Sequence, residues 1–594
     1  MSKKKALVSL LLCGAMLFGA LPVSAEGRAY NDRDEVVKTG IDLSAPTTLT
    51  IAKPLKAVTT TATKYYITGS SDPDRNLTVN GAAVEDRGQY GSWGVLVNLA
   101  VGKNVFTVNN GGTTQTVIIT REKGDSAVAK TTKLTAAKPT ADDYAFTGEY
   151  TLSCTAPSGA KVSAKVGSQT VELEQAVATA EDGVPATYKG TVLLEEGSID
   201  SIDYTMTYNG QSSTVKSAGT LLVFDSDTQP TVIINQNSTT IYESNDTSSN
   251  FVAMLNKGAM DKIVEMGDTL AKLSLGGWVK KEFIEIVEDN PSIENRISKV
   301  TWELGEGGEY MTLNGTVAST FKSYMNSEKV YLRFYNMYGV DNFSVKKSEL
   351  FDKVQISSDS RSTTIELYTK EADSVLGYDV RYNEDGTITV FFNEKPKIGT
   401  AEQPLKGVTV VIDAGHGGAD PGALGVLNAA FGPTEDDITM AHALALQKRL
   451  ESLGANVIMS VPTTLPQSKK VVLHERVQIT REAEADFFVS LHCNSVGGTA
   501  NDLKSKGSEV YYYENISRDF AKDVVSALSE QTGRDLRGTY YSNYFVNRNT
   551  TCPGFLLEMG FVSNPKEYDH LRSEDSLFAT ANAVSDGILN FLSK

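Results

Sequence analysis

The feature that most constrains the fold is a change of hydrophobic pattern close to Pro404. Before it, the chain shows short alternating runs rich in Val, Thr and Tyr, separated by turn signals, which are typical of β-strands. After it, apolar runs of strand length alternate with longer segments of helical period. A parallel strand pair needs a crossover connection, so this alternation predicts a mostly parallel sheet with helices on both faces. We therefore predict a multidomain chain in which several all-β modules precede one α/β domain at residues 405–594.

Polar side chains stand where the predicted strands of this α/β domain end. His416 directly follows the strand "VTVVIDA", His492 lies near the end of "DFFVSLHCNS", and Glu558 lies near the end of "GFLLEMGF". Glu435 opens the helix that follows, with Thr434 placed to cap it. Ligands of open parallel sheets bind at the carboxyl ends of the strands. These four residues are therefore expected to meet at one rim.

Two imidazoles and one carboxylate form a donor set that suits zinc, and a catalytic zinc site keeps one position for water. A second, unligated carboxylate can then take a proton from that water. Strand alternation puts Cys493 on the face opposite His492, so we interpret Cys493 as a core residue.

The glycine-rich stretch "DAGHGGADPGALG" lets the chain turn sharply beside His416 without side chains crowding a metal. Asp413 and Asp420 within it are interpreted as acceptors that order the loop. The other histidines are predicted to be bystanders on helical or loop surfaces: His442, His474 and His570.

The segments "VVIDAGHGGADPGALG", "LHERVQITREAEADFFVSLHCNS" and "PGFLLEMGFVSNPKE" resemble the zinc N-acetylmuramoyl-L-alanine amidases of the Amidase_3 type. The resemblance implies that zinc is held by His416, Glu435 and His492. It assigns Glu558 as the catalytic glutamate and aligns Arg476 with an arginine whose role is structural or substrate-contacting. The implied reaction is hydrolysis of peptidoglycan, at the amide between N-acetylmuramic acid and L-alanine of the stem peptide, by a zinc-activated water.

Upstream of the α/β domain the pattern predicts four β-rich modules. Residues 49–122 resemble an immunoglobulin-like sandwich, and residues 140–226 are predicted to form a second β-sandwich. Residues 230–290 resemble a small Src-homology-like barrel, and residues 295–396 resemble an amidase-associated targeting module. Residues 26–48 are predicted to be a flexible leader and residues 123–139 a linker.

Residues 1–25 have the order of a secretory signal: three lysines, an apolar run and a small-residue cleavage site. We therefore expect a protein secreted by a bacterium, acting outside the cell or in the cell wall, with no membrane span after signal removal. The net charge of −17 disfavours nucleic acid as a partner, because phosphate binding needs clustered cations. The oligomeric state is not predicted.

Three cysteines remain after the signal: Cys154, Cys493 and Cys552. An odd number in so long a chain is not a disulfide framework, and the pattern favours separate buried thiols over a bridge between Cys493 and Cys552.

Two rival functions are consistent with the same residues. One is a wall-binding protein whose amidase domain is inactive. The other is a zinc hydrolase on this fold that cleaves a different amide, such as a peptidase. Substrate choice depends on loops, so the sequence does not exclude the second.

Overall fold

The computed structural model describes residues 33–123, 129–177, 181–287, 295–314, 319–340, 347–463, 470–496 and 504–594. The chain forms two compact units. Met1–Arg121 and Lys395–Lys594 make one unit, and Glu122–Glu394 make the other. The predicted signal at residues 1–25 lies outside the described residues.

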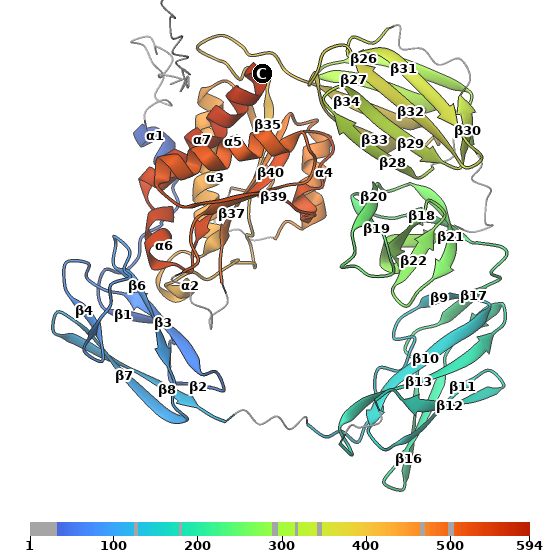
Figure 1. The fold of residues 1–594 in the computed structure, drawn as a ribbon, viewed down its shortest axis with the longest axis horizontal. Helices are drawn as coiled ribbons and strands as arrows, with labels where there is room; N and C mark the ends of the chain where they lie inside the picture. The colour runs from blue at the N-terminus through green and yellow to red at the C-terminus, as the bar shows by residue number, and fades with distance from the viewer. Residues whose placement is uncertain are drawn as a thin grey trace, which may run out of the picture. The chain divides into compact units, whose positions relative to one another are not determined.

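The α/β domain is built on a six-stranded sheet (Figure 1). Its order is β36 (Asn456–Met459), β35 (Thr409–Ala414), β37 (Phe487–Asn494), β40 (Gly554–Phe561), β38 (Ser508–Tyr512) and β39 (Leu536–Tyr541). Neighbouring strands are parallel except β38 and β40, which pair antiparallel. The prediction of a mostly parallel sheet is confirmed.

Helices cover both faces of this sheet, as predicted. One face packs under α3 (Glu435–Ser452), α5 (Ser517–Thr532) and α7 (Glu574–Ser593). The other face packs against α4 (Leu473–Glu482) and the 3-10 turn η3 (Phe545–Asn547). The short helices α2 (Asn428–Phe431) and α6 (Pro565–Leu571) lie in the connections.

Alternation along β37 divides its side chains between the two cores. Phe487, Val489, Leu491 and Cys493 belong to the core beneath α3 and α5. Phe488 belongs to the opposite core, and His492 shares its face by alternation. The interpretation of Cys493 as a core residue is confirmed.

The start of α3 follows the predicted capping pattern. The Thr434 N–H donates to the Asp437 carboxylate at 3.1 Å, which satisfies a main-chain donor that the helix leaves unpaired. At the other end, Gly454 adopts φ +95°, a conformation that favours glycine. This capping fixes where Glu435 enters the first turn.

The first β module, residues 49–122, forms two sheets in the order β1-β3-β6 and β2-β8-β7-β4-β5. The strands are β1 (Thr50–Lys53), β2 (Val58–Thr60), β3 (Lys64–Ser70), β4 (Leu77–Val79), β5 (Ala82–Ala83), β6 (Ser92–Asn98), β7 (Gly102–Asn110) and β8 (Thr113–Arg121). Main-chain N–H groups of Tyr90 and Ser92 donate to the Asp569 carboxylate of α6 at 2.7 and 3.2 Å. The module is therefore docked on the α/β domain.

Part of the predicted flexible leader is ordered, which corrects that prediction for residues 33–48. Helix α1 (Arg33–Val37) buries Val36 and Val37 against α3 and α7. Ile41 and Leu43 pack beside them. The segment is polar by composition, but its few apolar residues fill the groove between two helices that are distant in sequence.

The second unit contains three successive β-rich parts. The first carries β9 (Asp143–Phe146), β10 (Gly148–Pro157), β11 (Lys161–Val166), β12 (Gln169–Gln175), β13 (Pro185–Leu194), β14 (Gly197–Ile199), β15 (Asp203–Tyr208), β16 (Gln211–Lys216) and β17 (Leu221–Phe224). The second carries β18 (Thr231–Ile234), β19 (Thr239–Tyr242), β20 (Phe251–Leu255), β21 (Met260–Met266), β22 (Leu270–Leu273), β23 (Gly277–Lys280), η2 (Lys281–Phe283) and β24 (Ile284–Ile286). The third carries β25 (Asn295–Ile297), β26 (Lys299–Gly305), β27 (Gly308–Asn314), β28 (Phe321–Asn326), β29 (Lys329–Tyr335), β30 (Met337–Val340), β31 (Phe351–Ser358), β32 (Ser362–Thr369), β33 (Val375–Tyr382) and β34 (Ile388–Glu394).

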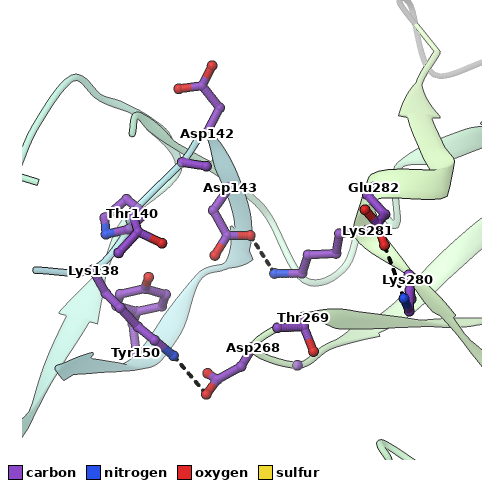
Figure 2. Close-up of a pocket in the computed structure, with 13 residues that line it drawn as sticks. Lys138, Thr140, Asp142, Asp143, Tyr150, Asp268, Thr269, Lys280, Lys281 and Glu282 are labelled. Atoms are coloured by element: carbon purple, nitrogen blue, oxygen red, sulfur yellow. Dashed lines mark hydrogen bonds and ion pairs between the residues drawn. The ribbon is translucent and has the colours of Figure 1, made fainter. Parts of the chain in front are cut away.

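The end of the predicted linker, residues 123–139, belongs to the first of these parts. Leu134 and Ala137 are buried in its core, because they pack between its strands. A cavity of about 510 Å³ lies where this part meets the next. Two ion pairs line it, Lys138 with Asp268 at 2.8 Å and Lys281 with Asp143 at 2.6 Å (Figure 2).

Candidate metal and catalytic site

His416 sits in a strained loop immediately after β35. Its φ is +65°, which is uncommon for a residue with a side chain and is typical of functional positions. The Arg476 guanidinium holds this loop by donating to the carbonyls of Ala414 at 2.7 Å and His416 at 2.5 Å. The same guanidinium donates to the Asp413 carboxylate at 2.8 Å.

Arg476 is therefore a positioning residue in this structure. Its side chain is only 3% exposed and is directed into the protein. Asp413 also accepts hydrogen bonds from the hydroxyls of Ser460 and Ser490. The interpretation of Asp413 as a loop-ordering acceptor is confirmed.

Two glycines leave room for the site. A Cβ atom on Gly415 would lie 2.5 Å from Cε1 of His492. A Cβ on Gly422 would lie 2.6 Å from Cδ2 of His416 and 2.7 Å from Oε2 of Glu435. Any larger residue at either position would displace these side chains.

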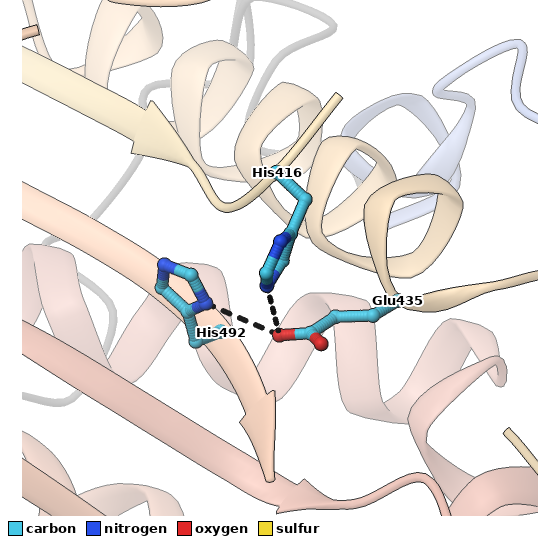
Figure 3. A group of neighbouring side chains, drawn as sticks. All are labelled: His416, Glu435 and His492. Carbon is cyan, nitrogen blue, oxygen red and sulfur yellow. Dashed lines mark hydrogen bonds and ion pairs between the residues drawn. The ribbon is translucent and has the colours of Figure 1, made fainter. Parts of the chain in front are cut away.

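Figure 3 shows His416, Glu435 and His492 converging from three elements. Oε1 of Glu435 lies 3.2 Å from Nε2 of His416 and 3.1 Å from Nδ1 of His492. The three potential ligand atoms lie within 4.8 Å of one another. Two imidazole nitrogens and one carboxylate oxygen fit a zinc ion with an open fourth position.

The electrostatics of Glu435 suit a ligand. Burial alone would raise its pKa, but hydrogen bonds and charge interactions with the two imidazoles hold the pKa of Glu435 well below its usual value. Its second oxygen accepts from the Ala423 N–H at 2.9 Å. The carboxylate is thus ionised and fixed in orientation.

Asp420 orients His416 from the side away from Glu435. Its Oδ1 lies 3.3 Å from Nδ1 of His416, and its Oδ2 accepts from Lys470 at 2.7 Å. The Lys470 ammonium lowers the pKa of Asp420 to about 2. A carboxylate on one imidazole nitrogen leaves the other free to face a metal. This agrees with the interpretation of Asp420 as an acceptor.

Glu558 stands beside the three potential ligands. It is paired in register with His492 across β37 and β40. Burial raises the pKa of Glu558 to about 7, against a smaller opposing effect from His492. Its Oε2 is buried and has no hydrogen-bond partner among the described residues. A group with that pKa can accept and return a proton near neutral pH.

Glu509, the neighbour of Glu558 on β38, was not among the predicted site residues. Glu509 is buried and accepts from Asn494 at 2.7 Å, from Tyr511 at 3.0 Å and from Arg537 at 2.6 Å. Strand alternation in "SEVYYY" could have put Glu509 and Tyr511 on one face, but only the strand order places that face next to Glu558.

The prediction that the remaining histidines lie on surfaces is wrong for His442. It is fully buried, with Nδ1 at 3.0 Å from Oγ1 of Thr580 and Nε2 at 2.8 Å from the Leu571 carbonyl. Burial lowers the pKa of His442 to about 3. His570 is half-buried, and His474 is exposed as predicted.

Cys154, Cys493 and Cys552 are buried free thiols. This agrees with the expectation of separate thiols.

A parallel sheet with histidine and glutamate donors at its carboxyl edge defines an α/β domain with a candidate metal centre. Residues 410–590 match the family model described as N-acetylmuramoyl-L-alanine amidase, Amidase_3. Over 188 residues the chain is 36% identical to the uncharacterized protein YqiI of Bacillus subtilis, spanning 32% of this chain and 86% of that protein. The chain therefore belongs to the Amidase_3 family of hydrolases, through its C-terminal domain.

Two further relatives carry functional names. The probable cell wall amidase LytH of Staphylococcus epidermidis is 30% identical over 193 residues, which span 32% of this chain and 61% of LytH. The catalytic domain of CwlV, an N-acetylmuramoyl-L-alanine amidase from Bacillus (Paenibacillus) polymyxa var. colistinus, is 34% identical. That comparison covers 31% of this chain and 98% of the CwlV domain, with a TM-score of 0.28.

Proposed function

We propose that this chain is a secreted, zinc-dependent peptidoglycan hydrolase. It cleaves the amide between the lactyl group of N-acetylmuramic acid and the L-alanine of the stem peptide. The observation that carries the proposal is the convergence of His416, Glu435 and His492, with Glu558 in register with His492. Oε2 of Glu558 is buried and has no hydrogen-bond partner among the residues that the structure describes. The family match supplies the reaction class.

In this proposal His416, Glu435 and His492 hold the zinc ion. When bound, zinc lowers the pKa of a water molecule and polarises the scissile carbonyl. Asp420 and Arg476 keep His416 in place, through its ring nitrogen and its carbonyl. Glu558 accepts the proton of the attacking water and delivers it to the departing alanine nitrogen.

The proposed site of action is the bacterial cell wall. The signal-like order of residues 1–25 supports secretion. The similarity to LytH, a probable cell wall amidase, supports this location. None of the helices in the described parts of the chain has the length and apolar character needed to cross a membrane. We propose that the upstream β modules hold the enzyme on the wall, where tethering raises the local substrate concentration.

Product analysis on purified muropeptides tests the reaction. The expected products are an intact stem peptide with a new L-alanine amine and a muramic acid with a free lactyl carboxylate. Cleavage between two amino acids of the stem would instead identify a peptidase. Stoichiometric zinc without any cleavage would identify a wall-binding protein with an inactive amidase domain.

A further inference from the structure

Three tyrosines form a partly exposed patch at the edge of the α/β sheet. This tyrosine patch consists of Tyr511 on β38, Tyr540 on β39, and Tyr544 in the segment that follows. The Tyr511 ring centroid lies 5.7 Å from that of Tyr540 and 5.0 Å from that of Tyr544. Tyr540 and Tyr544 are 43% and 44% exposed. Large aromatic faces held open to solvent in one group are uncommon unless they bind something.

The tyrosine patch lies on the same face of the sheet as Glu558. In the register of the strands, Glu558 is opposite Glu509, and Tyr511 is opposite Tyr540. Paired residues project to the same face, as do residues two apart on one strand, so Glu509 and Tyr511 continue the face of Glu558. Tyr511 also packs against the core on that side and donates to Glu509 at 3.0 Å. Strands are about 4.8 Å apart, which puts β39 about 10 Å from β40.

Gly538 allows the Tyr540 ring to lie along its strand. A Cβ on Gly538 would approach the Tyr540 hydroxyl to 2.9 Å, so the ring covers the space that a side chain would take. The hydroxyl then donates to the Arg537 carbonyl at 2.8 Å, which fixes the ring. A flat ring that is already fixed on the face of Glu558 offers a stacking surface, and it loses little conformational entropy when a ligand binds.

We propose that the tyrosine patch binds sugar rings of the glycan chain next to the muramic acid whose amide is cleaved. The inference rests on the proposed function, because it assigns the glycan part of the proposed substrate to the tyrosine patch beside the proposed catalytic site. The C–H face of a pyranose ring stacks on an aromatic face, and the sugar hydroxyls and acetamido groups can exchange hydrogen bonds with the phenols.

The charges around the patch favour the glycan over the stem peptide as occupant. Carboxylates of a stem peptide would need a cation, but the nearby Arg537 is already bound to Glu509 at 2.6 Å and lies over the Phe561 ring at 5.0 Å. Glu509 and Glu558 add acidic groups on the same face. A neutral sugar chain meets no such repulsion.

The test compares two substrates that carry the same stem peptide, one on a single N-acetylmuramic acid and one on a tetrasaccharide. For Tyr540→Ala and Tyr544→Ala we expect KM on the tetrasaccharide to rise about tenfold, the order expected when an aromatic face is no longer covered. KM on the monosaccharide should change less than about twofold, which also shows that the variants are folded. Tyr540→Phe should raise KM on the tetrasaccharide less than Tyr540→Ala does, because it keeps the ring and loses only the hydroxyl that donates to the Arg537 carbonyl.

Tyr541→Ala is the matched control. Tyr541 is the next residue on β39, is 55% exposed, and contacts Tyr512 on the opposite face. Its removal should leave both KM values unchanged. Equal changes on both substrates, or no change on either, would overturn the proposal, as would an effect that follows the length of the stem peptide.

Calorimetry with a peptide-free tetrasaccharide of the glycan separates this inference from the proposed function. The parent chain should bind it, with the affinity reduced about tenfold in Tyr540→Ala and unchanged in Tyr541→Ala. Binding without hydrolysis of any muropeptide would contradict the proposed function and leave the sugar site standing. Hydrolysis of muropeptides together with the same glycan affinity in all variants would support the proposed function and contradict the sugar site.

Discussion

Glu435 contacts both histidines of the candidate metal centre through Oε1, which also accepts from the Cys493 N–H, and its Oε2 accepts from the Ala423 N–H. Oε2 of its neighbour Glu558 is buried and has no hydrogen-bond partner within the described parts of the chain. The two environments suit the carboxylates to different roles. Glu435 is kept ionised by the two imidazoles, whereas burial raises the pKa of Glu558 to about 7. Groups with pKa values pushed apart in one site are typical of ligand and acid–base pairs.

Glu558→Gln should lower turnover on a muropeptide by at least about a hundredfold and leave zinc content near the parental value, because glutamine keeps the shape but carries no transferable proton. Rates and metal content of the purified variant check this, with Glu530→Gln on the exposed surface of α5 as control. Turnover within a few-fold of the parent would remove the catalytic role. Lost zinc would make Glu558 a ligand.

His492→Ala should lose both bound zinc and activity, since only two of the three donors would remain. Atomic absorption on the purified protein measures the metal, and the exposed His474→Ala provides the control. A full equivalent of zinc in His492→Ala would exclude this residue as a ligand.

At the scale of elements, His442 joins three helices of the α/β domain. It projects from α3, contacts Thr580 of α7, and approaches the carbonyl at the end of α6. Burial holds the pKa of His442 near 3, so the folded domain binds this histidine in its neutral form. A proton added at acid pH therefore favours the unfolded chain, whose histidine has an ordinary pKa of about 6.5.

This linkage predicts a pH dependence of stability. The contribution of neutral His442 is complete above about pH 6.5 and falls by up to about 1.4 kcal/mol per pH unit as the pH decreases toward 3. His442→Gln should be less stable than the parent at pH 7.5, because the two hydrogen bonds are altered, but should lose less stability between pH 6.5 and 4.5. Urea unfolding at several pH values measures both. If the free energy of unfolding fell equally with pH in both proteins, His442 would not be the source of the pH dependence.

At the scale of the whole molecule, the first β module and the segment before it form one compact unit with the α/β domain. The Asp569 carboxylate is held by two N–H groups of the module and by Arg572 at 3.0 Å. A Cβ on Gly88 would lie 2.1 Å from the Asp569 carboxylate, so the contact is close-packed. The Thr68 hydroxyl donates to the Val426 carbonyl at 2.6 Å, in the loop between His416 and Glu435.

We therefore expect a fragment of residues 406–594 to fold and to cleave soluble muropeptides, but with a Tm several degrees below that of the full chain. Its α3–α7 groove, lined by Ala441, Ala445, Leu577 and Ala581, would lose the cover of Val36 and Val37. Val36→Asp in the full chain should lower Tm in the same direction, because it puts a charge into the buried α3–α7 groove. An equal Tm for fragment and full chain would show that the docked segments add no stability.

Much of the α/β domain was predictable from local pattern. Strand and helix periods, the cap at Thr434 and the alternation that buries Cys493 are properties of short segments, and each segment largely specifies its own backbone conformation. The rule that parallel strands end at a common edge brought His416, Glu435 and His492 together on sequence grounds. The structure places one potential ligand atom of each within 4.8 Å of the others. Their roles as ligands, and that of Glu558, stay predictions.

Other features were decided only by tertiary structure. His442 appeared to be a surface residue, and residues 33–48 appeared unstructured, because neither segment encodes which distant helix will cover it. Strand β38 lies between β40, to which it is antiparallel, and β39, to which it is parallel. This order puts Glu509 and the tyrosine patch beside Glu558, although nothing in "SEVYYY" or "LRGTYY" specifies which strands will be neighbours. Periodicity determines the face on which a side chain lies, whereas packing between elements far apart in the sequence determines what that face meets.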